Sequence, residues 1–406
     1  MHHPRYLHSR LTSILHFLLE CYLLRVIQFW FDYPVYALKR CWNLMDRYHV
    51  AIDSYQSMQD VHLTRSISYG AHPREKYHIM SPTRHHVIRG NIIYVHGGGF
   101  VASCREMYYN SFTFLVRRGY RVFVVDYPLS PQSRHPQPTL SLLRCLHSLK
   151  KQHSSWKMEH VHMVGDSAGA NLILLATAVQ QNKHVWQHFQ QCLPPSDSEE
   201  MSSFELPNVT TCVSIYGMIH RRMGGRAKFP VGLCLHFLWE CVSNYPNLST
   251  KNQSHESSPS FPVSFDDVLE HFGRLVLPPT QFVVGDGDPL LHDSLHVHRK
   301  MKSMSSQSST LHVYQGGFHG FFGLPPEWQP FDLWKAAALP CSSQVYEFLN
   351  DHTSVTRDES IPMTGSRRIG CDWFGVIVIL QLAVVMPMFI VGAPVLLCWW
   401  LARWCV

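Results

Sequence analysis

The sequence lacks long runs of like charge. Charged residues make up only 16% of the 406 residues, and 35 Lys and Arg against 29 Asp and Glu leave a net charge of +6. Basic pairs such as Arg117 with Arg118 are scattered along the chain, which is typical of a solvated surface rather than of a phosphate-binding track. We therefore expect no nucleic-acid partner.

The sequence also lacks the cysteine spacings of disulfide frameworks and the spacings of known metal sites. The 12 cysteines form no Cys-x-x-Cys pair and no disulfide-framework spacing, which indicates reduced thiols. His292, His296 and His298 have helical spacing, but no acidic or Cys residue accompanies them at the spacing of a zinc site. We interpret them as a solvated helix face and expect no metal.

Charged residues are also missing from one long segment. Residues 373–402 contain no Asp, Glu, Lys or Arg, and tryptophans lie at both ends of the segment. A helix needs about 20 apolar residues to cross the hydrocarbon core of a bilayer, and buried core helices are usually shorter. We therefore expect a membrane anchor that contacts the lipid bilayer. Two prolines within it leave a kinked span and a re-entrant hairpin both open.

Positive charge predicts the orientation of this anchor. Arg357, Arg367 and Arg368 precede it and only Arg403 follows it, which favours a cytosolic location for the bulk of the chain. We expect the membrane to be that of the endoplasmic reticulum.

Short apolar runs alternate with helical patterns through the middle of the chain. The runs predict strands at 91–95, 121–126, 160–164, 210–216, 280–284 and 310–314. The helical patterns lie at 109–118, 140–150, 171–181 and 293–304. Such alternation predicts an α/β fold with a mainly parallel central sheet and helices on both faces.

A serine motif lies between a predicted strand and a predicted helix. In Gly165-Asp166-Ser167-Ala168-Gly169, small residues on both sides of the serine permit the strained turn that exposes its hydroxyl. We expect Ser167 to be a nucleophile. The N–H of Ala168, at a helix N-terminus, is expected to face developing negative charge.

Three glycines follow the first predicted strand. In His96-Gly97-Gly98-Gly99, the absence of side chains lets backbone N–H groups approach a substrate oxygen closely. We expect Gly98 and Gly99, together with Ala168, to form an oxyanion hole, in which one donor is worth about 10²–10³ in rate. His96 is expected to orient the loop.

A serine nucleophile needs a base, and the base needs an orienting carboxylate. Asp288 and His319 follow the last two predicted strands, at the carboxyl ends where open α/β sheets bind ligands. The chain order Ser167, Asp288, His319 is that of the α/β-hydrolase fold. Asp286 and Asp293 are the competing acids.

Five motifs in this order resemble the hormone-sensitive lipase family of the α/β-hydrolase superfamily, which includes bacterial esterases and arylacetamide deacetylases. They are HGGGF at 96–100, D-Y-x-L-x-P at 126–131, GDSAG at 165–169, D-P-L-x-x-D at 288–293 and H-G-F at 319–321. The resemblance implies an α/β-hydrolase fold with a helical cap, a triad of Ser167, Asp288 and His319, and ester hydrolysis without a cofactor. The chain departs from the family at Ser130 and Gln132, where members usually carry Ala and Glu.

The resemblance also predicts the chemistry, whereas the anchor at 372–402 lies outside the family pattern and rests on the uncharged segment alone. Together they predict a membrane-anchored serine hydrolase that cleaves lipid-like or other hydrophobic acyl esters through an acyl-enzyme. Amide deacetylation by the same mechanism is an alternative, as is a non-catalytic small-molecule receptor on the same fold. Receptors of that kind replace the catalytic histidine, which is present here as His319.

The expected organisation has four parts. They are an amphipathic or cap region at 1–60, a catalytic domain at 61–352 with cap insertions at about 192–207 and 218–275, a linker at 353–371 and the anchor at 372–402. Within the first part, residues 11–37 carry polar side chains on one side at helical spacing. We expect an amphipathic helix there that lies on the membrane or covers the active site, with a signal anchor as the alternative.

Overall fold

The computed structural model describes the middle of the chain. The described residues are 60–83, 87–101, 103–130, 132–156, 158–221, 239, 242–243, 260–304, 308–315, 317, 319–322 and 332–352. None of the helices within these ranges has both the length and the apolar character needed to cross a membrane. The helix expected at 11–37, the linker and the anchor expected at 372–402 lie outside the described residues.

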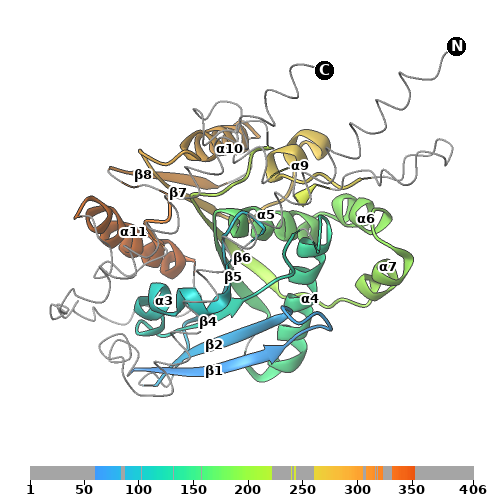
Figure 1. The fold of residues 1–406 in the computed structure, drawn as a ribbon, viewed down its shortest axis with the longest axis horizontal. Coiled ribbons are helices and arrows are strands. Elements are labelled where there is room, and N and C mark those ends of the chain that lie inside the picture. Colours follow the sequence, from blue (N-terminus) through green and yellow to red (C-terminus); the bar gives the residue numbers. More distant parts are fainter. Residues whose placement is uncertain are drawn as a thin grey trace, which may run out of the picture.

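One sheet runs through the described part of the chain (Figure 1). Its eight strands are β1 (Val61–Ser68), β2 (Lys76–Pro82), β3 (Gly90–Val95), β4 (Tyr120–Val125), β5 (His160–Asp166), β6 (Asn208–Ile215), β7 (Thr280–Gly285) and β8 (Ser309–Tyr314). They lie in the order β1-β2-β4-β3-β5-β6-β7-β8. β2 pairs antiparallel with β1 and β4, and all the other pairs are parallel. The predicted mainly parallel sheet is confirmed.

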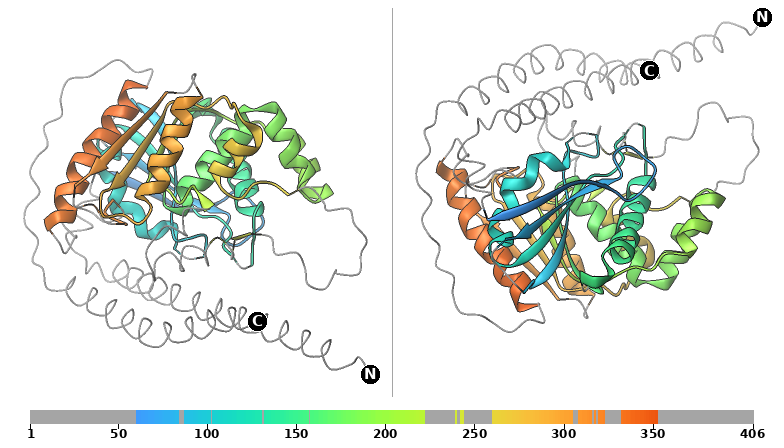
Figure 2. Two further views of the ribbon diagram at one scale, coloured as in Figure 1. Left: turned by 90° about the horizontal axis from the view of Figure 1, so that it is seen from above. Right: turned by 90° about the horizontal axis from the view of Figure 1, so that it is seen from below.

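Helices cover both faces of this sheet (Figure 2). One face carries α3 (Tyr109–Val116) and α11 (Asp332–Asp351), and the other carries α4 (Gln137–Gln152), α5 (Ala168–Gln181), α9 (Phe265–Phe272) and α10 (Leu291–Ser303). The short 3-10 helices η1 (Arg105–Tyr108) and η2 (Ser154–Trp156) precede α3 and follow α4. α6 (Lys183–Gln191) and α7 (Pro195–Ser202) follow α5, and α7 falls within the stretch expected as a cap insertion at 192–207.

The inner parallel strands, such as β3, are buried on both sides because helices cover both faces of the sheet. In β3, Ile93 and Val95 belong to the core under α4 and α5, whereas Ile92 and Tyr94 belong to the core under α3 and α11. These continuous apolar runs are what predicted the parallel strands. β1 is mostly exposed and polar, so neither it nor its antiparallel partner β2 gave such a signal.

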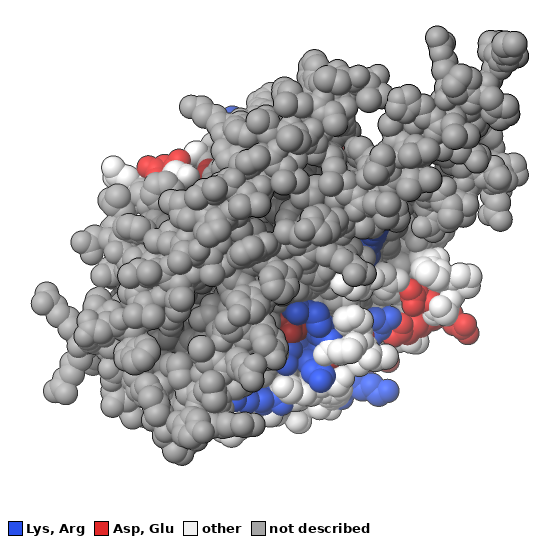
Figure 3. All heavy atoms as spheres, in the orientation of Figure 1, with Lys and Arg blue, Asp and Glu red and all other residues white. Residues whose placement is uncertain are grey.

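Surface charge follows the scattered pattern of the sequence. On the described part of the face in Figure 3, Lys and Arg side chains lie beside Asp and Glu side chains. An example among the described residues is Arg144, whose guanidinium lies 2.6 Å from the partly exposed carboxylate of Glu200 and 2.6 Å from the buried carboxylate of Glu75.

Candidate active site

Ser167 lies at the turn between β5 and α5, at the carboxyl end of a central strand. Its φ of 50° and ψ of −116° put a non-glycine residue in a strained conformation. Its N–H donates to the carbonyl of Ile215 and its carbonyl accepts from the N–H of Met218, both at 2.9 Å. These two bonds to the segment at the end of β6 hold the strained turn in place.

Close backbone contacts explain the glycines on either side of Ser167. A Cβ on Gly169 would lie 2.1 Å from the carbonyl oxygen of Val95, and a Cβ on Gly165 would lie 2.6 Å from the carbonyl oxygen of Gly169. α5 therefore begins directly against the end of β3. Because β3 leads into the glycine loop, this contact brings the loop next to the serine turn.

His319 links Ser167 to Asp288. Its Nε2 lies 3.1 Å from Oγ of Ser167, and its Nδ1 lies 3.1 and 3.2 Å from the two carboxylate oxygens of Asp288. Because an ionised carboxylate only accepts hydrogen bonds, Nδ1 carries the proton, and the lone pair of Nε2 accepts from the serine hydroxyl. The structure thus brings together the three residues expected to act as nucleophile, base and acid.

The carboxylate that faces the imidazole belongs to Asp288 and to neither of its competitors. Asp288 is buried in the turn after β7, where Oδ1 also accepts from the N–H of Leu290 at 2.8 Å. Asp286 is exposed to solvent. Asp293 is buried and accepts the backbone N–H of His220 at 3.2 Å, and burial raises its pKa well above the ordinary value.

The pKa of His319 is raised above its ordinary value of 6.5. Desolvation of the ring, whose side chain stays 37% exposed, is the largest influence and acts against the charged form. The charge of Asp288, the hydrogen bond to it and the charge of Asp166 together outweigh this desolvation. The imidazole is therefore a stronger base than a free histidine. A base of this kind suits the removal of a proton from a serine hydroxyl.

The glycine loop is tied to the residue that precedes Ser167. Gly98 (φ 103°) and Gly99 (φ 60°) adopt left-handed conformations that favour glycine. The N–H of Gly97 donates to Oδ1 of Asp166 at 2.7 Å. Ala168 is fully buried as the first residue of α5, and the N-terminus of a helix favours negative charge.

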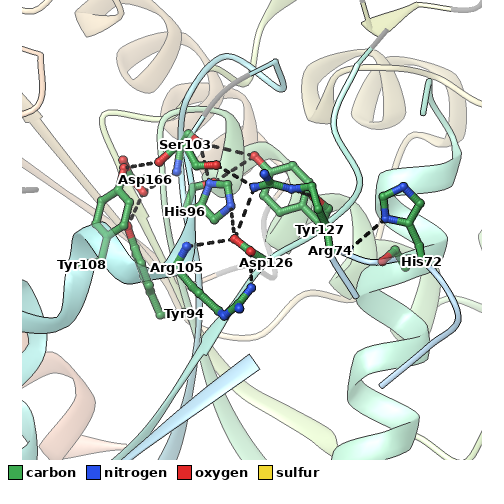
Figure 4. Close-up of polar contacts among 12 residues, drawn as sticks. His72, Arg74, Tyr94, His96, Ser103, Arg105, Tyr108, Asp126, Tyr127 and Asp166 are labelled. Atoms are coloured by element: carbon green, nitrogen blue, oxygen red, sulfur yellow. Dashed lines mark hydrogen bonds and ion pairs between the residues drawn. The ribbon is translucent and has the colours of Figure 1, made fainter. Parts of the chain in front are cut away.

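Asp126 is a buried anchor beneath this loop, and the sequence pattern assigned it no role (Figure 4). Its Oδ1 lies 3.0 Å from Nε2 of His96 and accepts the N–H of Arg105 at 2.8 Å and the guanidinium of Arg74 at 3.4 Å. Its Oδ2 accepts from the guanidinium of Arg105. Burial opposes the charge of Asp126, but the hydrogen bond with His96 and the neighbouring cations hold its pKa below the ordinary value.

His96 connects this anchor to the glycine loop. Its Nδ1 donates to the carbonyl of Gly97 at 2.7 Å, and its own carbonyl accepts from the hydroxyl of Tyr127 at 3.0 Å. The ring therefore bridges Asp126 and Gly97, as expected of a residue that orients the loop.

Ser130 supports the loop through its backbone. Its N–H donates to the carbonyl of Phe100 at 2.9 Å, and its hydroxyl donates to the carbonyl of Ser133 at 3.0 Å. The bond to Phe100 uses only the main chain, so the replacement of the usual Ala by Ser at this position leaves it unaffected.

The middle of the chain matches the family described as alpha/beta hydrolase fold over residues 92–323. Curated relatives include the acetyl esterases of Salmonella paratyphi B (strain ATCC BAA-1250 / SPB7) and Salmonella agona (strain SL483), each 26% identical over 237 residues. These alignments cover 57% of this chain and 65% of each relative. The chain thus spans just under two thirds of the length of these relatives.

Solved structures of esterases have a similar fold. Esterase B from Lactobacillus rhamnosis is 16% identical, with a TM-score of 0.56 over 79% of this chain and 96% of that one. The esterase LipW from Mycobacterium marinum is 17% identical, with a TM-score of 0.55 over 78% of this chain and 90% of that one. At such low identity the likeness establishes the shared fold.

Proposed function

The chain belongs to the α/β-hydrolase family that contains the hormone-sensitive lipase-like esterases, and on this premise we propose that it hydrolyses carboxylic esters with a triad of Ser167, His319 and Asp288. The observation that carries the proposal is the chain of hydrogen bonds through His319. Its two ring nitrogens lie 3.1 Å from Oγ of Ser167 and 3.1 Å from Oδ2 of Asp288. The similarity to acetyl esterases supports the same class of reaction.

The proposed reaction begins at the serine hydroxyl. Nε2 of His319 takes the hydroxyl proton as Oγ of Ser167 attacks the ester carbonyl carbon, and Asp288 stabilises the imidazolium that forms. The imidazolium then gives its proton to the departing alcohol, which leaves an acyl-enzyme on Ser167. Water, deprotonated by the same imidazole, releases the acid and restores the serine.

Backbone N–H groups are proposed to stabilise the negative charge on the carbonyl oxygen. The donors are those of Gly98, Gly99 and Ala168, from the glycine loop and the start of α5. The support for this assignment is the fixed position of both segments, since Gly97 is bonded to Asp166 and α5 abuts β3 at Gly169. Donors held in place before the reaction cost no reorganisation when charge develops.

The proposal extends to the substrate and its location. We propose hydrophobic acyl esters as substrates, presented to a cytosolic catalytic domain that the segment 372–402 anchors at the endoplasmic reticulum membrane. The uncharged run at 373–402 and the arginines that precede it support this part of the proposal. An enzyme held at a bilayer has direct access to esters that partition into lipid.

Hydrolysis of a p-nitrophenyl ester series, from acetate to palmitate, tests the reaction. We expect turnover by the unmodified protein and a loss of at least about 10³-fold in kcat for Ser167→Ala. Ser294→Ala is a matched control, because the Ser294 hydroxyl is buried and has no hydrogen-bond partner among the described residues. The length of the acyl chain in the ester that gives the highest kcat/KM indicates the length of the pocket that binds the acyl group.

Two results would contradict the proposal. One is a folded protein without turnover on any ester of the series. The other is turnover that persists at the same rate in Ser167→Ala, because the nucleophile would then lie elsewhere.

A further inference from the structure

Two histidines and an aspartate converge from three separate elements of the described structure. His220 follows β6, Asp266 lies in the first turn of α9, and His296 lies in the middle of α10. We propose that these three side chains bind one divalent transition-metal ion, for which Zn²⁺ is the best fit. None of the three belongs to the hydrogen-bonded group around Ser167.

The donor atoms are close enough for one ion to contact all three after small side-chain rotations, since they lie within 4.8 Å of one another. Nδ1 of His220 is 3.5 Å from Oδ2 of Asp266, and Nε2 of His296 is 3.3 Å from the other carboxylate oxygen, Oδ1. Two ligand atoms on a tetrahedral Zn²⁺, each about 2.1 Å from the metal, are about 3.4 Å apart.

The carboxylate of Asp266 is buried in a way that calls for a cation. The side chain is fully buried, yet Oδ2 accepts no hydrogen bond from the residues that the structure describes. A buried charged oxygen without a donor costs considerable free energy. A metal ion between the two imidazoles would satisfy this oxygen.

Lys300 neutralises only one side of the same carboxylate. Its Nζ lies 2.7 Å from Oδ1 of Asp266, and it also lies 3.5 Å from Oε1 of Glu270, which is half exposed. The ammonium group thus has a second acceptor toward solvent. When a metal ion binds Asp266, Lys300 can pair with Glu270.

The two imidazoles suit a borderline metal such as zinc. Their rings lie next to each other in a tilted arrangement, with centroids 4.5 Å apart and an angle of 32° between the planes. Two imidazole nitrogens and one carboxylate oxygen are a ligand set of zinc sites, whereas Mg²⁺ and Ca²⁺ prefer oxygen ligands alone.

His296 is accessible, which leaves room for a water molecule as the fourth ligand. Its side chain is 44% exposed, whereas those of His220 and Asp266 are 7% and 1% exposed. The exposed histidine also explains how an ion would reach the site. The sequence spacing of His292, His296 and His298 did not reveal this group, because the partners of His296 come from other elements.

The ion would brace the segment that holds the nucleophile turn. The N–H of Met218 binds the carbonyl of Ser167, and the carbonyl of Ile219 accepts the N–H of Asp266 at 3.0 Å. His220 is the next residue. A metal ion bound here would therefore link the segment after β6 to α9 and α10.

Titration of the full chain with ZnCl₂, after dialysis against a chelator, tests the proposal. We expect isothermal titration calorimetry to show one tight equivalent of Zn²⁺ and no comparable heat with MgCl₂. His296→Ala is expected to weaken that equivalent by at least about 100-fold, because even groups that only support a metal ligand contribute 10–100-fold. His292→Ala is the matched control, since His292 is an exposed histidine four residues earlier on α10.

A second readout separates binding from folding. Without metal, the two variants should have similar unfolding temperatures. ZnCl₂ should raise the unfolding temperature of the unmodified protein and of His292→Ala, but not that of His296→Ala. Equal zinc affinity in His296→Ala and in the control would overturn the proposal. So would the absence of a tight equivalent in the unmodified protein.

Discussion

The backbone N–H of Gly97 donates a 2.7 Å hydrogen bond to Oδ1 of Asp166, the residue that directly precedes Ser167. The same oxygen accepts the hydroxyl of Tyr94 at 2.6 Å. One buried carboxylate therefore joins the glycine loop, the end of β3 and the serine turn. Burial raises the pKa of Asp166, although these two hydrogen bonds favour the charged form and oppose the shift in part.

Tyr94→Phe is predicted to loosen this junction. The variant removes one of the donors to Asp166, and a hydrogen bond to a buried carboxylate contributes about 1.5–3 kcal/mol. We expect the free energy of unfolding to fall by that amount and kcat/KM for an ester to fall about tenfold or more. Urea denaturation and ester hydrolysis measure the two effects.

Tyr108→Phe is the control for this variant. The ring of Tyr108 packs 5.1 Å from that of Tyr94. Its hydroxyl contacts Ser103 at 3.5 Å and is hydrogen-bonded to Tyr94, but it makes no hydrogen bond with Asp166 in the described part of the chain. If both variants lost the same stability and activity, the bond between Tyr94 and Asp166 would have no special part in the site.

Asp126→Asn is predicted to destabilise the fold. The substitution removes the charge that neutralises the buried guanidinium of Arg105 and that of Arg74, and breaking such a pair costs about 3–5 kcal/mol. Because the pKa of Asp126 is lowered in the folded protein, its charge stabilises the fold above the ordinary value of 3.8. That contribution is lost as the pH falls through the lowered pKa.

The measurement is the free energy of unfolding of both proteins as a function of pH. The difference between them should be full at neutral pH and should shrink below pH 3.8. Asp197→Asn, at a half-exposed carboxylate bonded to Gln137, should change stability much less. A difference that stayed constant at all pH values would contradict the account of Asp126.

The pH profile of ester hydrolysis should report the raised pKa of His319. Only the neutral imidazole accepts the serine proton, so kcat/KM should rise with pH through a value above 6.5. Asp288→Asn removes the charge that raises this pKa. We expect the rise to move to lower pH while kcat falls by about 10⁴-fold.

Asp286→Asn is the control, because Asp286 lies two residues earlier but is exposed to solvent. Its profile should match that of the unmodified protein. A shift of the profile in Asp286→Asn, with none in Asp288→Asn, would show that Asp286 and not Asp288 is the carboxylate that acts on His319.

Charge placed in the uncharged segment should release the protein from membranes. Val384→Arg combined with Val385→Arg puts two cations near the middle of residues 373–402. Each arginine raises the free energy of membrane insertion by about 2.5–3.5 kcal/mol. We expect the unmodified protein and an alanine pair at the same positions to remain in the membrane pellet after carbonate washing, and the arginine pair to leave it. Retention of all three would show that this segment is not the anchor.

The strands and helices that were predicted are those with strong local patterns. β3 to β8 are short apolar runs followed by turn residues, and each begins and ends within two residues of its predicted bounds. β1 and β2 escaped prediction because their pairing is antiparallel and β1 carries polar, exposed side chains. β1 and β2 can be recognised as strands only from their pairing with each other, and not from the sequence of either segment alone.

The residues of the proposed site also fall into those that a local motif predicted and those that it did not. Ser167, Asp288 and His319 each lie in a motif at the end of a strand, so the sequence alone predicted that they would meet. Asp126 also opens a motif, but its partners Arg74 and Arg105 belong to separate elements. Their convergence depends on the antiparallel pairing of β2 with β4, which brings the region of Arg74 beside Asp126.

Reaction with a fluorophosphonate tests the central claim most directly, because only an activated serine reacts with it rapidly. The account predicts one phosphonyl group per chain, located by mass spectrometry on Ser167. It also predicts about the same extent of labelling in Ser294→Ala and none in Ser167→Ala. A folded chain that is not labelled, or that is labelled on another serine, would contradict the assignment of Ser167 as the nucleophile.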